Sequence, residues 1–104
     1  MASDLPLVRV VFPDLAAELA SLLVEEGEFD LATAIAGLRL VADCGCGDDF
    51  CQSFYTADRP DGAYGPGHRC VPLLPAKGML ILDVVDDRIM YVEVLARAPM
   101  RDRR

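Results

Sequence analysis

The strongest structural signal in the chain lies in residues 79–96, which read MLILDVVDDRIMYVEVLA. Two runs of β-branched and other apolar residues, 79–85 and 89–96, flank the polar segment Asp86-Asp87-Arg88. This pattern is typical of a β-hairpin, and aspartate suits the turn because its side chain caps local backbone groups. The pattern predicts the central hairpin of an antiparallel sheet.

More strands are expected upstream of this hairpin. Residues 38–43 alternate in polarity and run into Cys44, and residues 51–57 are rich in aromatic and hydroxyl side chains. The intervening Gly47-Asp48-Asp49 has turn chemistry, so the two segments are expected to form a hairpin. Residues 70–74 form a further candidate strand that ends before Pro75.

The first third of the chain has a helical pattern. Pro13 and the leucines that follow at helical spacing predict an amphipathic helix that ends at Gly27. Asp30 is placed to cap a second, short helix over residues 31–36. Residues 7–12 are expected to form either a short strand or an extended lead into the first helix.

Length and composition fit one small domain. The 104 residues are 53% hydrophobic and 26% charged, which is enough to form a core without disulfides or metal. We expect a single domain over residues 1–104 with a short basic tail at 97–104. Helices first and strands afterwards predict an α+β fold, with N-terminal helices packed on an antiparallel β-meander of about four to six strands.

The charge of the chain limits its partners and its location. The net charge of −7 repels phosphate backbones, so nucleic acid is not an expected partner. No signal peptide and no stretch of about 20 apolar residues is present, so a cytoplasmic protein without membrane contact is expected. The arginines of the tail are interpreted as a solvated end or a docking tail. In a reducing cytoplasm, the four cysteines are expected to be thiols or metal ligands.

The cysteines suggest a zinc site. On a strand, Cys44 and Cys46 point to the same face, and a four-residue loop places Cys51 opposite Cys46. Tetrahedral zinc requires sulfur atoms about 3.8 Å apart, which such a hairpin can provide, and either Cys70 or His68 could complete the shell. The spacing differs from that of zinc ribbons and fingers. Packed thiols without metal are the competing interpretation.

The segment around the single histidine offers two further candidates. His68 and Cys70 are two residues apart, which on a strand places them on one face, as a thiol-dependent enzyme would need. No third residue that would orient the histidine is evident from the sequence. The glycine-rich loop before them contains Tyr64, and Tyr64, His68 and Arg69 are candidates for the lining of a small pocket.

Three stretches of the chain carry a resemblance. Residues 44–55 (CGCGDDFCQSFY), 62–69 (GAYGPGHR) and 78–85 (GMLILDVV) together resemble small bacterial proteins of unknown function. The resemblance covers roughly the C-terminal two thirds of the chain. It implies a bacterial origin and implies no activity or ligand.

Three functions are compatible with these patterns. The leading hypothesis is a non-enzymatic binding domain that associates with itself, or with another protein, through an exposed sheet edge or an apolar sheet face. The alternative is a structural zinc-binding protein that uses Cys44, Cys46 and Cys51 with Cys70 or His68. The third is a thiol-dependent enzyme that uses Cys70 and His68. The sequence favours a domain without catalysis, since no catalytic group has more than one convincing member.

Overall fold

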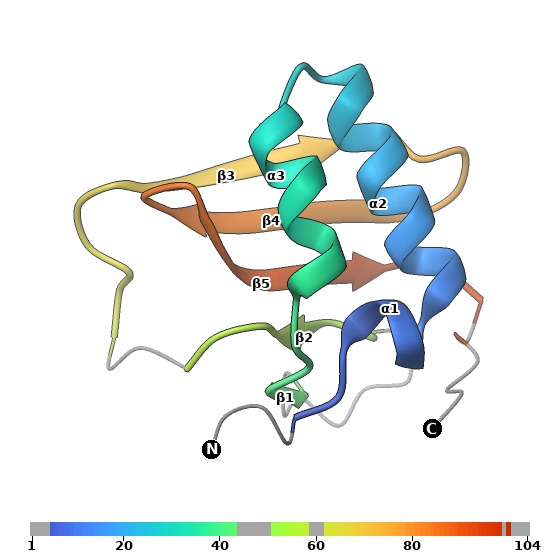
Figure 1. Cartoon of the computed structure of the whole chain (residues 1–104), viewed down its shortest axis with the longest axis horizontal. Coiled ribbons are helices and arrows are strands. Elements are labelled where there is room, and N and C mark those ends of the chain that lie inside the picture. The colour runs from blue at the N-terminus through green and yellow to red at the C-terminus, as the bar shows by residue number, and fades with distance from the viewer. Residues whose placement is uncertain (1–4, 44–50, 59–61, 99, 101–104) are drawn as a thin grey trace.

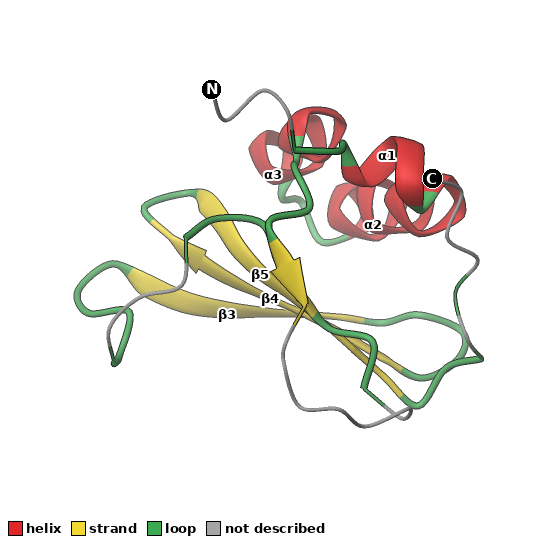
Figure 2. Cartoon of the chain, turned by 90° about the horizontal axis from the view of Figure 1, so that it is seen from below, coloured by secondary structure: helices red, strands yellow, loops and turns green. Residues whose placement is uncertain are grey.

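A computed structural model describes residues 5–43, 51–58, 62–98 and 100. Among these residues, the helices lie together over one face of a five-stranded antiparallel sheet (Figure 2). The predicted α+β fold, with N-terminal helices on an antiparallel sheet, is confirmed. No helix of this described part is long and apolar enough to cross a membrane.

The helices precede the strands along the chain (Figure 1). They are α1 (Val8–Val11), α2 (Pro13–Glu25) and α3 (Phe29–Ala34), which continues as a 3-10 turn over Ile35–Gly37. The strands are β1 (Ala42–Asp43), β2 (Phe54–Tyr55), β3 (His68–Leu73), β4 (Met79–Val85) and β5 (Arg88–Leu95). Their order in the sheet is β1-β2-β5-β4-β3. The hairpin of β4 and β5 therefore lies inside the sheet, as predicted, and β3 lies at one edge.

The core forms between the helices and the inner face of the sheet. Alternate side chains of the two central strands are fully buried there, as the period of two in a strand requires. Helical side chains at a spacing of three and four residues cover them. The fully buried aliphatic and aromatic side chains are Val8, Val11, Leu19, Leu23, Leu31, Phe54, Leu80, Leu82, Val84, Ile89, Val92 and Val94.

The prediction for residues 7–12 is wrong, because α1 occupies most of this segment. Val8 and Val11 lie three residues apart, and one helical turn buries both side chains completely. The backbone N–H of Val8 also donates to the carbonyl of Leu38 at 2.9 Å. Tertiary packing therefore overrides the β-propensity of the valines.

The predicted strand over residues 38–43 is much shorter in the structure. Only Ala42–Asp43 form a strand, and they pair with Phe54–Tyr55, so the strand predicted over residues 51–57 is also reduced to two residues. Leu38 and the residues after it face the N-terminal segment instead: the backbone N–H of Leu40 donates to the carbonyl of Pro6 at 2.8 Å. Packing against this segment replaces pairing in the sheet.

The second helix begins earlier than predicted. Asp30 does not cap it, because α3 already starts at Phe29 and its N-cap residue is Glu28. The Glu28 carboxylate pairs instead with the guanidinium of Arg69, with N–O distances of 2.8 and 3.0 Å. These two hydrogen bonds with Arg69 lower the pKa of Glu28. The pair connects β3 to the helical layer.

None of the described helices lies on the second face of the sheet (Figure 2). We call it the open face and define it by the outward side chains of β3, β4 and β5: His68, Cys70, Pro72, Met79, Ile81, Asp83, Val85, Arg88, Tyr91, Glu93 and Leu95. Each of them is half-buried or exposed, whereas their inward neighbours on β4 and β5 are buried. The open face is therefore an apolar surface with a few polar groups.

Substitutions on the two faces of β4 should differ in cost. Leu82 points into the core and is 0% exposed, so Leu82→Ala is expected to lower the free energy of unfolding by about 2–5 kcal/mol. Ile81→Ala removes a similar side chain from the open face and should cost less than half as much. Urea unfolding of both variants measures the difference. Equal losses would mean that the open face is as fully covered as the core.

Candidate functional site

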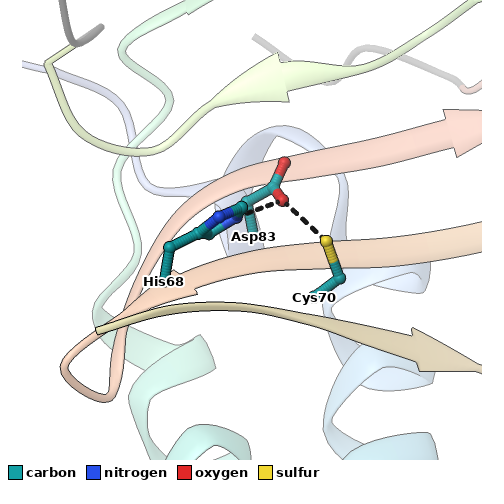
Figure 3. A group of neighbouring side chains, drawn as sticks. All are labelled: His68, Cys70 and Asp83. Carbon is teal, nitrogen blue, oxygen red and sulfur yellow. Dashed lines mark hydrogen bonds and ion pairs between the residues drawn. The ribbon is translucent and has the colours of Figure 1, made fainter. Parts of the chain in front are cut away.

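Three side chains of types that ligate metal ions meet on the open face at the β3–β4 pair (Figure 3). Asp83 lies directly opposite Cys70 in the register, and His68 points to the same face two residues before Cys70. The Nε2 atom of His68 lies 2.9 Å from Oδ1 of Asp83, and the Cys70 thiol donates to the same oxygen at 3.3 Å. One ligand atom from each residue lies within 4.8 Å of the others.

An irregularity in the sheet lies beside Asp83. Asp83 pairs with Tyr91, but the next residue, Val84, pairs with Ile89, so Met90 is an extra residue in β5. Such a bulge increases the local twist and changes the direction of nearby side chains. It therefore contributes to the orientation of Asp83.

The loop before β3 fixes the position of His68. Gly67 has a φ of +84°, and a Cβ atom at this position would overlap the side chain of Asp86 in the β4–β5 turn. The backbone N–H of Asp86 donates to the carbonyl of Gly67 at 3.3 Å. The ring of Tyr64 lies 4.8 Å from the ring of His68, measured between centroids. The loop is thus attached to the turn, and its tyrosine supports the imidazole.

Asp83 favours the protonated form of the Cys70 thiol. The hydrogen bond to the Asp83 carboxylate raises the pKa of Cys70, and desolvation and the negative charges of Asp83 and Glu93 raise it further. A protonated thiol is a poor nucleophile, because the thiolate is the reactive form. Within this group of three side chains, the imidazole of His68 contacts the Asp83 carboxylate and makes no hydrogen bond to the Cys70 sulfur. This arrangement does not activate Cys70 as a nucleophile–base pair would.

The same three groups have the chemistry of a zinc site. Imidazole nitrogen, thiolate sulfur and carboxylate oxygen are all zinc ligands, with bond lengths of about 2.0–2.3 Å. Tetrahedral geometry with these bonds separates the ligand atoms by about 3.3–3.8 Å. Separations of 2.9 and 3.3 Å, with all atoms within 4.8 Å, require only small side-chain movements to reach that geometry.

The other predicted ligands are distributed differently. Cys44 and Cys46 lie outside the described residues. Cys51 bridges to Leu95 at the far end of β5, and its thiol donates to the hydroxyl of Ser53 at 3.3 Å. Counting strand spacings and residues along the sheet places its Cα about 20 Å from that of Cys70. The structure thus brings Cys70 together with His68 but not with Cys51.

The candidate pocket residues also separate. Tyr64 and His68 are in contact, as stated above, but Arg69 points to the helical side of the sheet, where it pairs with Glu28. Sequence reasoning missed Asp83. The available signal was a single carboxylate at an outward position of an otherwise apolar strand, but the strand register that places it beside Cys70 could not be derived.

The reactivity of Cys70 tests this arrangement. Cys70 should react with iodoacetamide at pH 7 several-fold more slowly in the native protein than in urea. Asp83→Asn should accelerate the native reaction, because removing the charged acceptor lowers the pKa of the thiol. Mass spectrometry of the Cys70 peptide gives both rates, and Glu25→Gln, which neutralises an exposed carboxylate at the end of α2, is the control. A native thiol that reacts faster than the unfolded one would instead favour the thiol-dependent enzyme.

No protein-family model matches the chain, and neither a curated protein nor a solved structure is significantly similar to it. The chemistry of His68, Cys70 and Asp83 is therefore the basis for a functional proposal.

Proposed function

We propose that the protein binds a divalent metal of the zinc class through His68, Cys70 and Asp83. The observation that carries the proposal is the convergence of one nitrogen, one sulfur and one oxygen ligand atom within 4.8 Å. A mixed set of this kind suits zinc, whereas calcium and magnesium prefer oxygen ligands alone.

Metal binding changes the protonation and the charge of the site. The bound form of a cysteine is the thiolate, so the metal displaces the Cys70 proton that Asp83 holds in the free protein. With a neutral imidazole, the site then changes from one negative charge to none. The bound metal therefore offsets the electrostatic repulsion between the Asp83 carboxylate and the Cys70 thiolate.

The site keeps one coordination position open. Three protein ligands leave a fourth position of a tetrahedral zinc ion for water or another group. The side chains of His68 and Asp83 are 31% and 19% exposed, so this position is accessible from the open face. A site of this kind can bind an external ligand, which a closed four-residue site cannot.

The larger ligand set, with Cys44, Cys46 and Cys51 joined by Cys70 or His68, remains an alternative proposal. The two sets share residues of β3 but make opposite predictions for Cys51. The larger set would require Cys51 to move, because it lies about 20 Å from Cys70 by strand counting and the ligand atoms of one zinc ion lie within about 4 Å of each other. A Cys51 variant therefore distinguishes them.

An interaction function remains the second proposal, and the open face supports it. The predicted sheet-edge route is less favourable, because the edge strand β3 contains Pro72, which has no N–H to give to an added strand. The predicted sheet-face route is supported by the partly exposed Ile81, Val85, Tyr91 and Leu95. Binding through the open face is therefore the form of this proposal that we retain.

Zinc titration of the reduced protein tests the metal proposal. Calorimetry should show about one zinc ion per chain, and zinc should raise the Tm because it binds only the folded form. Cys70→Ser and Asp83→Asn should each weaken binding by at least about tenfold, whereas Cys51→Ser should bind as the wild type does. Loss of binding in Cys51→Ser would favour the larger ligand set. Equal binding in all three variants would exclude both sets.

A further inference from the structure

The open coordination position faces a surface that carries another carboxylate. Glu93 on β5 points to the open face, and β4 separates it from Cys70 on β3. Glu93 pairs with Ile81 and not with Asp83, so it lies two strand spacings across and two residues along the sheet from Cys70. This places the two Cα atoms about 12 Å apart, whereas a glutamate carboxylate lies about 5 Å from its own Cα. Glu93 is therefore too far away to complete the metal site of its own chain.

Glu93 can instead reach the metal site of a second copy of the chain. We infer that two copies pack open face against open face, and that the metal in each copy takes its fourth ligand from Glu93 of the partner subunit. This inference rests on the proposed metal site, because without a bound metal Glu93 has nothing to ligate.

Standard sheet packing has the dimensions that this contact needs. Two sheets stack face to face about 10 Å apart. A metal held by side chains of β3 and β4 lies about 5 Å above its own sheet, and an extended glutamate from the opposite sheet covers the remaining distance. A two-fold axis that passes between Cys70 and Glu93 exchanges the two positions, so one symmetric interface forms both metal sites.

The side chains around the site are suitable for such an interface. Ile81 lies beside Asp83 on the same face, and Val85, Tyr91 and Leu95 extend the apolar surface along β4 and β5. They are partly exposed in the single chain, so a second copy would remove further apolar area from water. No helix is available within the described part of the chain to cover them (Figure 2).

Charge makes this association dependent on the metal. The outward positions of β4 and β5 carry three charged side chains: Asp83 and Glu93 are acidic, and Arg88 lies at the turn opposite Val85, so this part of the face has a net negative charge. Two such faces repel each other, and the net charge of −7 on each chain adds to the repulsion. A metal neutralises Asp83 by ligation and attracts Glu93 of the partner subunit. The free protein should therefore be monomeric and the zinc-bound protein dimeric.

Light scattering coupled to size exclusion tests this inference on the whole reduced chain. At tens of micromolar protein, one equivalent of zinc chloride should double the mass, and a chelator should return it to that of the monomer. Glu93→Gln should stay monomeric with zinc, while calorimetry still shows about one zinc ion per chain. Glu25→Gln, with the same charge change on the opposite layer, should form the dimer as the wild type does.

Each contrary result has a distinct meaning. A wild-type chain that binds zinc and remains monomeric overturns the dimer and leaves the metal proposal intact. A Glu93→Gln variant that still doubles its mass overturns the assignment of the fourth ligand. A wild-type chain that binds no zinc overturns the metal proposal and, with it, the dimer. Thermal melting of Glu93→Gln without zinc, compared with the wild type, shows that its fold is unchanged.

Discussion

Burial of the inner face of β4 and β5 against the helices determines where everything else in the chain lies. Leu80, Leu82 and Val84 alternate with Ile81 and the other outward residues of β4, and a shift of one residue in register would exchange the two sets. Because the inner set is completely buried, this register is strongly favoured. The outward direction of Asp83, and therefore the existence of a polar group on the open face, follows from the packing of its apolar neighbours.

The elements with a strong local pattern could be predicted from the sequence. The β4–β5 hairpin and the helix from Pro13 have periodic apolar residues and clear turn or end signals, and both are present. Residues 7–12 could not be assigned correctly, because their helical turn depends on a hydrogen bond to Leu38 and on burial by distant residues. The shortness of β1 and β2 also depends on distant residues, because the segment before β1 packs against the N-terminal residues instead of extending the sheet.

The candidate site was only partly accessible to sequence reasoning. His68 and Cys70 could be placed on one face, because their spacing of two is a local property of a strand. Asp83 could not be added, since its position beside Cys70 depends on the register across the 74–78 connection, which no local pattern specifies. The zinc expectation for Cys51 relied on a hairpin brought near β3, whereas the bridge to Leu95 holds it at the opposite end of β5.

Two of the three candidate ligands lie on β3, the strand at the edge of the sheet, and the third lies on its neighbour β4. Edge strands open more easily than central ones, because they have hydrogen-bonded neighbours on one side only. An ion shared by the two strands would act as a cross-strand clip and slow this local opening. Bound metal would then slow amide exchange in β3. The exchange rates of the central hairpin, which the core already holds, would change little.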